Sequence, residues 1–365
     1  MTPDPRLHAG IPIAANDQLL DMSILHAVRL IRLAKSTANG VLALLNDEVF
    51  PDLLAMIRRR LERIEARGFD VGLHTTKRLK ELGRQIDGIL REGMTQAQRS
   101  LIPELNGIAR MEAEFWAIRI PRVMPIEVDF ITPSPATLNA IVRERPFEGQ
   151  LLGKWFKSLE RSTQAGVRGA VNIGLAEGEP VDAIVRRVRG TAAARFTDGI
   201  LETSRRNAQS IVRTAVNHIT TQAREATYAE NQDVVKAVQQ ISTLDHRTTL
   251  ICISLDGKVW PINDGPRPPH HFSCRSTTVP VLKSWKELGI DLKEAPPGTR
   301  ASLNGQVPDT TTYPEWLRRQ PVDVQNEVLG VGRARLWRSG DINAGQFIDR
   351  RLRPISLAEL LRLEG

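Results

Sequence analysis

Apolar residues recur at steps of three and four along most of the chain, the period of an amphipathic α-helix. The pattern predicts successive helices from residue 17 onward, then at 51–66, 71–91 and 95–116. Asn39-Gly40 is a candidate break in the first of them, and Asn46 or Asp47 could cap the next. Gly93 is predicted to end a helix. Together these segments predict an N-terminal helical bundle or hairpin over residues 17–120.

Prolines interrupt this pattern at both ends of the N-terminal region. Residues 1–16 contain three prolines and no periodicity, which predicts an extended arm. Residues 121–145 contain four more prolines, which exclude a continuing helix. The alternation of Ile126, Val128 and Phe130 fits a short strand or an extended linker. We therefore expect a linker over 121–145.

The rest of the chain alternates between helical and β-branched stretches. One helix is predicted to end at residue 171, and two more are predicted at residues 181–188 and 198–229. Candidate strands follow at residues 234–243, 250–254, 258–261 and 277–282. Asp256-Gly257 is a strong hairpin signal between the second and third of these strands. The fold class expected is α+β and predominantly α-helical. Its central helices would carry a small β-hairpin-containing unit within a core at 146–285.

A linker and a basic helical tail are expected over 286–365. The prolines at 296–297 mark the linker, and Ser356 with Glu359 forms a capping box that opens the last helix.

Composition narrows the class of protein. Charged residues make up 25% and apolar residues 41%, so a buried core is feasible and wholesale disorder is not expected. The net charge is +8, which favours a polyanionic partner such as nucleic acid. The alternative is a solvated basic surface that has no specific partner. No apolar run is long enough to span a membrane, and no signal-peptide layout is visible at the N-terminus. Two cysteines fit a reducing compartment, so we expect the protein in the cytoplasm where it is made.

The chemistry-bearing residues gather between residues 244 and 280. Cys252, His271 and Cys274 could converge there, and their residue types favour zinc. A closed structural site needs a fourth ligand, for which Asp245, His246 and His270 are candidates. Three alternatives stay open. The cysteines could be buried free thiols or form a disulfide, and the histidines could be hydrogen-bonded structural residues.

Arginine–carboxylate pairs are a second feature of this region. Arg247 and Arg275 could each pair with Asp245 or Asp256, which would fix the loops geometrically. The chain contains no nucleophile elbow, phosphate loop, zinc-protease helix or dinucleotide fingerprint. We therefore expect no enzymatic activity.

The stretch from residue 244 to 280 contains four motifs: Asp245-x-Arg247-Thr248, Cys252, Leu255-Asp256-Gly257 and Pro268-Pro269-x-His271-x-x-Cys274-Arg275. In these motifs the chain resembles the Mu F-like head morphogenesis proteins of tailed phages. The helix segment Arg213-Thr214-Ala215 is similar to the family's Arg-Thr-Glu segment. With similar flanks, the resemblance covers residues from about 146 to 361. The similar positions in the flanks are Pro146-Phe147-x-Gly149, Trp155, Trp316-Leu317, Leu329-Gly330 and Arg333.

Two positions depart from the family pattern. Thr249 and Ser276 stand where relatives often have cysteines, which removes two expected thiolate ligands while leaving the fold intact. The resemblance implies a minor head protein inside the virion head near the portal, made in the host cytoplasm. It would aid head morphogenesis and DNA packaging or ejection. Implied partners are the portal protein, the major capsid or scaffolding protein, and packaged double-stranded DNA.

Two other classes of function remain open from the sequence. One is a metal-dependent nuclease that uses His271 with Asp245 or Asp256. The other is a general DNA-binding protein, for which a steep salt dependence of binding is expected.

Overall fold

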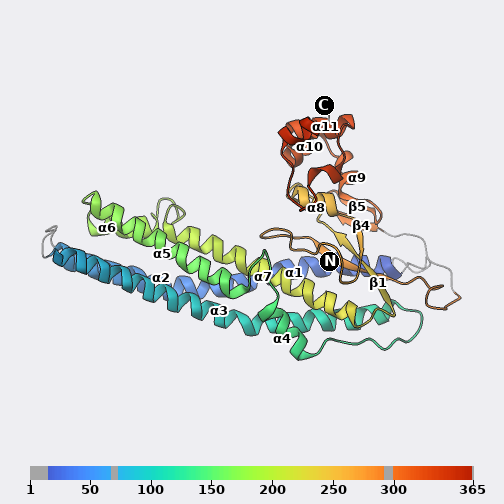
Figure 1. Cartoon of the computed structure of the whole chain (residues 1–365), viewed down its shortest axis with the longest axis horizontal. Helices are drawn as coiled ribbons and strands as arrows, with labels where there is room; N and C mark the ends of the chain where they lie inside the picture. The colour runs from blue at the N-terminus through green and yellow to red at the C-terminus, as the bar shows by residue number, and fades with distance from the viewer. Residues whose placement is uncertain (1–14, 67–72, 292–298, 364–365) are drawn as a thin grey trace. The chain divides into compact units, whose positions relative to one another are not determined.

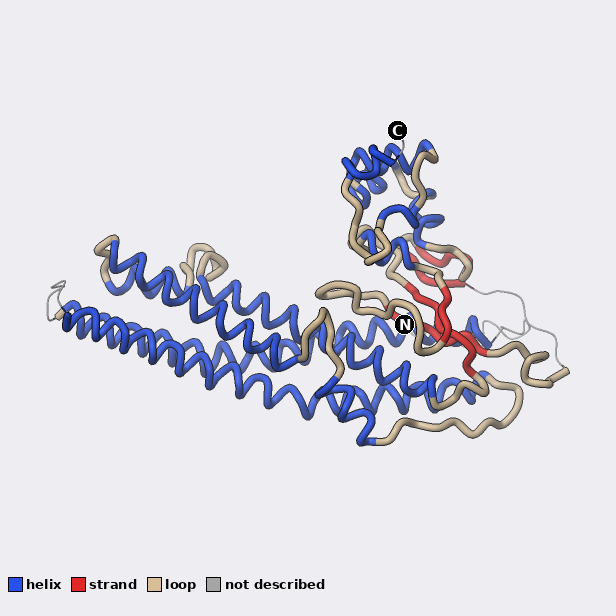
Figure 2. Tube along the Cα trace, in the orientation of Figure 1, coloured by secondary structure: helices blue, strands red, loops and turns tan. Residues whose placement is uncertain are grey.

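The computed structural model describes residues 15–66, 73–291 and 299–363. Figures 1 and 2 show long helices, small antiparallel sheets in the central region and a group of short helices near the C-terminus. The predicted α+β, predominantly helical class is confirmed. Residues 1–14 of the predicted arm lie outside the described residues, and Ala15 and Asn16 already belong to the first helix.

The chain divides into two compact units. One, which we call the sheet unit, consists of residues 1–31, 109–138 and 217–365. The other, the helical unit, consists of residues 32–108 and 139–216. Three long helices contribute residues to both units: α1 (Ala15–Leu44), α3 (Leu73–Val123) and α7 (Ile200–Ala229). The domain boundaries expected from the sequence stay a prediction.

The helical unit contains helices and no strand in its described residues. A π-helical turn, η2 (Leu45–Val49), joins α1 directly to α2 (Phe50–Glu65). The unit continues with α4 (Pro135–Glu144), α5 (Leu152–Ala176) and α6 (Val181–Arg189). The predicted break at Asn39-Gly40 is wrong, because α1 runs through it. Asn46 and Asp47 lie within η2 and do not cap α2, whose N-cap is Val49.

The helix α3 continues through the glycine that was predicted to end it. The described helix has 51 residues and runs from Leu73 to Val123 without interruption at Gly93. A Cβ atom at Gly93 would lie only 2.5 Å from the Val49 methyl carbons, so the residue allows η2 to pack closely on α3. Gly93 is therefore needed for close packing inside the helix. In the sequence alone, such a glycine cannot be told from one that ends a helix.

Substituting Gly93 tests this close approach. Gly93→Ala is expected to destabilise the protein by about 1–3 kcal/mol, because the added methyl group overpacks against Val49. At Gly88 in the same helix, an added Cβ would meet no atom within 4 Å, and Gly88→Ala should stabilise by about 0.5–1 kcal/mol. Urea unfolding of both variants is the measurement. Equal stabilisation by both substitutions would refute the packing role.

The sheet unit is centred on a three-stranded antiparallel sheet in the order β2-β1-β3. Its strands are β1 (Val235–Ile241), β2 (Val259–Pro261) and β3 (Thr277–Leu282), so three of the four predicted strands are confirmed. Val238 pairs with Trp260 on one side and with Pro280 on the other. One face of the sheet packs on a core that includes Trp116 and Tyr228.

The strand predicted at residues 250–254 is wrong, and so is the hairpin predicted between it and residues 258–261. Residues 250–255 form α8 (Leu250–Leu255), and the Asp256-Gly257 turn joins this helix to β2. A short apolar run does not distinguish strand from helix by periodicity alone. In the structure this run is helical, and Cys252, Ile253 and Leu255 are all buried in it. Gly257 adopts φ +77° and donates its N–H to Gln240 O at 2.8 Å, which starts β2 beside β1.

The predicted linker contains more helix and no strand in the structure. α3 extends to Val123 and α4 starts at Pro135. Between them, Ile131 donates its N–H to Asn231 Oδ1 at 2.7 Å and accepts from Asn231 Nδ2 at 2.8 Å. A single asparagine side chain thus takes the place of a partner strand.

The C-terminal part adds a hairpin and short helices. The hairpin pairs β4 (Thr299–Ser302) with β5 (Gly305–Pro308). The helices that follow are α9 (Tyr313–Arg318), α10 (Val322–Leu329), α11 (Val331–Ser339), η3 (Ala344–Phe347) and α12 (Leu357–Leu363). The capping box at Ser356 and Glu359 is confirmed by hydrogen bonds of 2.9 and 3.3 Å. Four fully buried aromatic residues lie at the centre of a core formed by this part: Tyr313, Trp316, Trp337 and Phe347. Leu244 and Ile253 also belong to this core.

None of the described helices is both long and apolar enough to cross a membrane.

Candidate functional site

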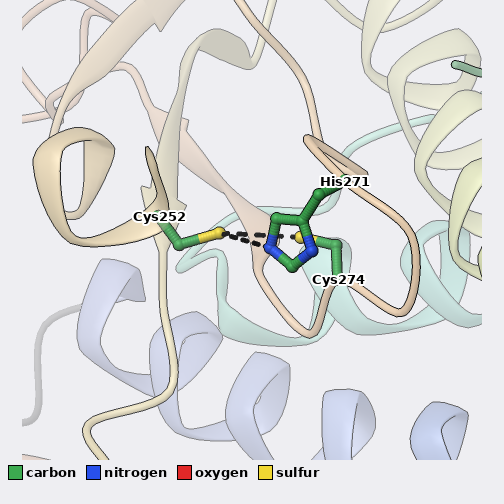
Figure 3. Close-up of side chains that lie close together, drawn as sticks. All are labelled: Cys252, His271 and Cys274. Atoms are coloured by element: carbon green, nitrogen blue, oxygen red, sulfur yellow. Dashed lines mark hydrogen bonds between the residues drawn. The ribbon is translucent and has the colours of Figure 1, made fainter. Parts of the chain in front are cut away.

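The two cysteines and one histidine singled out in the sequence meet in the sheet unit. Cys252 comes from α8, whereas His271 and Cys274 come from the loop between β2 and β3 (Figure 3). Cys252 Sγ lies 3.7 Å from Cys274 Sγ and 3.4 Å from His271 Nε2. The three ligand atoms all lie within 4.8 Å of one another. Both cysteines are buried free thiols, because a disulfide requires a sulfur–sulfur distance of about 2.05 Å.

Local hydrogen bonds orient the ligand atoms. His271 Nδ1 lies 2.9 Å from Phe272 O, and since a carbonyl oxygen only accepts, Nδ1 carries the proton and donates it. In the neutral ring Nε2 is then the atom whose lone pair can accept a hydrogen bond or bind a metal ion, which is the arrangement of a metal-binding histidine. Asn217 Nδ2 on α7 donates to Cys274 O at 2.7 Å, and Ser242 Oγ donates to Cys252 O at 2.9 Å. The backbone on both sides of the cluster is therefore fixed.

The two sulfurs differ in acidity. A hydrogen bond from Cys252 and the neighbouring His271 lower the pKa of the Cys274 thiol to about 3, against the effect of burial. The hydrogen bond to Cys274, together with burial, raises the pKa of Cys252. The contact between the two sulfurs therefore favours loss of a proton from Cys274 over loss from Cys252. A thiolate is the form of cysteine that binds metals.

The distances match those of a zinc tetrahedron. With Zn–S of about 2.3 Å and Zn–N of about 2.0–2.1 Å, tetrahedral geometry gives S···S of about 3.8 Å and S···N of about 3.6 Å. The measured 3.7 and 3.4 Å agree with both values. Two sulfurs and one imidazole nitrogen are also a donor set that zinc prefers. The residues present therefore fit this metal ion.

None of the three residues predicted as a fourth ligand belongs to the cluster. Asp245 is engaged by Arg275, His270 Nε2 lies 2.7 Å from Gln240 Oε1, and His246 is exposed. Thr249 and Ser276 bring hydroxyl oxygens to the cluster instead. Thr249 Oγ1 lies 3.0 Å from His271 Nε2, and both hydroxyls hydrogen-bond Cys252. These are the two positions at which the sequence is expected to depart from the family pattern.

The predicted Asp245–Arg275 pair is formed. Arg275 donates to both carboxylate oxygens of Asp245, at 2.6 and 2.8 Å. Burial acts to raise the pKa of Asp245, but Arg275 outweighs it and the pKa is lowered. The Asp-x-Arg-Thr motif also forms a local turn, since Arg247 N and Thr248 Oγ1 donate to Asp245 Oδ1 at 3.0 and 3.3 Å.

The arginine partner of Asp256 is Arg300, and neither of the two considered in the sequence, Arg247 and Arg275. Arg300 on β4 reaches Asp256 at 3.2 and 3.4 Å, and both side chains are almost fully buried. The backbone N–H groups of Ser242 and Tyr313 also donate to Asp256, at 2.5 and 2.7 Å. Arg300 could not be assigned from the sequence, because 44 residues separate it from Asp256 and no local motif contains it.

The carboxylates that the nuclease hypothesis paired with His271 are thus held by arginines. Asp245 bonds Arg275, Asp256 bonds Arg300, and His271 Nε2 lies against Cys252 and Thr249. Purified protein is not expected to cleave duplex DNA in zinc, magnesium or manganese. Cleavage that is lost on His271→Ala would revive the hypothesis.

The fold and the site together define the class of protein. It is a mostly helical protein with a small antiparallel sheet, and its cysteine–histidine cluster lies beside arginine–aspartate pairs. Residues 165–279 form a Phage Mu protein F-like domain, as shown by their match to the family described as Phage Mu protein F like protein. The match includes the Cys252, His271 and Cys274 cluster and the Arg213-Thr214-Ala215 segment. The similarity expected for the flanks, out to 146 and 361, lies outside the matched residues and stays a prediction. No curated protein and no solved structure matches the chain.

Proposed function

We propose that the protein is a minor head protein of a phage virion, placed inside the head near the portal vertex. It would take part in head morphogenesis and in DNA packaging or ejection. The observation that carries the proposal is the Mu F-like domain at 165–279, a domain of phage head proteins. The partly exposed Asp245–Arg275 pair, the buried Asp256–Arg300 pair and the aromatic core of the C-terminal part support a structural role, because they stabilise loops and occupy the carboxylates with arginines.

The proposed partners are the portal protein, the major capsid or scaffolding protein, and packaged double-stranded DNA. Co-expression with the portal protein of the same phage tests the first of these directly. We expect the chain to co-purify with assembled portal rings. A chain that stays unbound while portal rings form normally would contradict placement at the portal.

We further propose that Cys252, His271 and Cys274 hold a structural zinc ion. Bound there, zinc would link α8 to the β2–β3 loop and so stabilise the sheet unit. The fourth ligand would be the Thr249 hydroxyl or a water molecule. The proposal is supported by the match of the sulfur–sulfur and sulfur–nitrogen distances to zinc geometry and by the Nδ1–H orientation of His271.

Zinc content and an added ligand test this site. Protein purified without chelators is expected to contain close to one zinc per chain, and Cys274→Ser should abolish it. Thr249→Cys supplies a third thiolate beside His271 and should tighten zinc binding by about tenfold or more. Elemental analysis and competition with a chromogenic chelator are the measurements. Wild-type protein without zinc, together with no gain from Thr249→Cys, would rule the metal out.

A further inference from the structure

The net positive charge of the chain lies entirely in the helical unit. Residues 32–108 and 139–216 contain 26 Lys and Arg against 18 Asp and Glu, a net charge of +8. The sheet unit contains 24 of each and is neutral. A net charge confined to one unit implies that a polyanionic partner would be attracted to that unit.

Within the helical unit, two helices lie side by side. Arg168 on α5 forms an ion pair with Asp87 on α3, and Gln164 Nε2 donates to Asp87 O at 3.2 Å. Further along, Arg91 Nε on α3 lies 4.0 Å from Glu160 Oε1 on α5. Between these helices is a pocket of about 610 Å³, whose lining includes Lys80, Arg84 and Arg168.

Cations line both sides of this pocket and continue along the helices. On α3 they are Lys80, Arg84 and Arg91, at spacings of four and seven residues, and on α5 they are Lys154, Arg161 and Arg168, at spacings of seven. Such spacings place each set on one face of its helix. We call these six residues and the space between them the cationic groove. At 1.5 Å per residue, the α5 row spans about 21 Å.

The charges of the cationic groove are accessible to a partner. The side chains of Arg84, Arg91 and Arg168 are 71%, 63% and 45% exposed, and Lys80, Lys154 and Arg161 are also exposed. Three carboxylates lie near them. Asp87 and Glu160 are only 16% and 6% exposed and are paired with Arg168 and Lys157, while Glu81 is 40% exposed beside Arg84. The accessible surface is therefore dominated by positive charge.

We infer that the cationic groove binds the phosphate backbone of double-stranded DNA. Two rows of cations, about 17 Å long on α3 and about 21 Å long on α5, match a linear polyanion with one charge per about 1.7 Å of duplex. A protein interface normally has an apolar centre, yet in residues 77–91 and in α5, which the structure describes, Ile173 is the single large apolar side chain that is exposed, and it lies beyond the row of cations. An acidic protein is therefore the less suitable partner. The inference rests on the proposed function for the presence of DNA near the protein.

The full-length chain and a fluorescently labelled duplex of about 30 base pairs provide the test. Lys80→Gln, Arg84→Gln, Lys154→Gln and Arg161→Gln are combined in one variant. Each lost phosphate contact reduces the magnitude of the slope of log K against log salt by about 0.9, so four reduce it by about 3.6. At about 0.1 M salt the affinity should fall on the order of 10³-fold.

A control variant removes the same charge from the neutral unit. It combines Arg335→Gln, Arg350→Gln, Arg351→Gln and Arg353→Gln, all at exposed positions. We expect it to bind the duplex within about threefold of wild type, since non-contacting charges act only at long range. Circular dichroism confirms that both variants are folded.

Equal loss of affinity in both variants would overturn the inference, as would wild-type protein that binds polyglutamate as tightly as duplex at the same salt. Incorporation into particles is measured separately. A groove variant that still co-purifies with portal rings but no longer binds DNA supports both proposals. A chain that binds duplex through the groove but never enters particles leaves the inference standing and contradicts the proposed function.

Discussion

Replacing Arg224 by methionine is expected to lower the free energy of unfolding by about 3–5 kcal/mol, because it leaves Glu112 charged and buried without its main partner. Arg224 on α7 is 2% exposed and lies 2.8 and 2.7 Å from Glu112 Oε1 through Nε and Nη2. Glu112 on α3 is fully buried and also bonds His26 on α1 at 2.6 Å and Trp116 at 2.8 Å. One carboxylate therefore joins three helices of the sheet unit.

The Glu112 carboxylate also makes the free energy of unfolding depend on pH. Burial alone would raise the pKa of Glu112, but Arg224 and the hydrogen bonds from His26 and Trp116 lower it to about 2. A folded-state pKa below the ordinary 4.5 adds stability at higher pH, which is lost as the pH falls from about 4.5 to 2. The difference corresponds to about 3 kcal/mol.

Urea unfolding at about pH 7 and pH 3 measures both effects. Glu112→Gln should be destabilised at neutral pH, and between pH 7 and pH 3 it should lose about 2 kcal/mol less than the wild-type protein. Both proteins lose some stability in acid, because Asp245 and other carboxylates with a lowered pKa still become protonated. Lys236→Met, which breaks an exposed pair with Glu287, serves as a control and should change stability little. Wild-type stability at neutral pH in Arg224→Met would show that the buried network is not needed.

The second large effect is expected at Asp256. Asp256→Leu removes the carboxylate that neutralises Arg300 and accepts from Ser242 and Tyr313, and should cost about 3–5 kcal/mol. Because Tyr313 begins α9, the loss should also loosen the C-terminal helices. The near-ultraviolet circular dichroism should then lose the part of its signal that Trp316 and Trp337, two of the six tryptophans, contribute.

A double variant distinguishes two causes of the lost stability, an unpaired buried charge and poor packing. Asp256→Leu combined with Arg300→Met removes both charges and should recover part of the stability that Asp256→Leu loses. Asp245→Asn is a milder comparison, since the Asp245–Arg275 pair is 16–19% exposed. If Asp256→Leu were no more destabilising than Asp245→Asn, Asp256 would not be the main link to α9.

Sequence patterns located most elements because the signals are local. The β-branched residues of β1 and β3 and the three-and-four periodicity of α2, α6 and α7 each depend on residues a few positions apart. The errors arise where distant residues decide. Gly93 looks like a helix end until Val49 is placed against it, and residues 250–255 look like a strand until their burial on the C-terminal core is known.

The candidate site follows the same division. The spacing of His271 and Cys274, and the Asp245–Arg275 pair, were visible because they fall in one short stretch. Arg300, Asn217 and the Glu112–Arg224 pair carry no such signal, since their partners lie 44, 57 and 112 residues away. The roles of Thr249 and Ser276 beside Cys252 became clear only once the hydroxyls could be placed.

Electron cryomicroscopy of particles, combined with mass spectrometry of their proteins, tests the central claim most directly. A minor head protein carrying this Mu F-like domain should be detected in purified heads and should give density at the portal vertex inside the shell. That density should be missing from particles made without the chain. Mature, DNA-filled heads that contain none of the chain would contradict the proposed function.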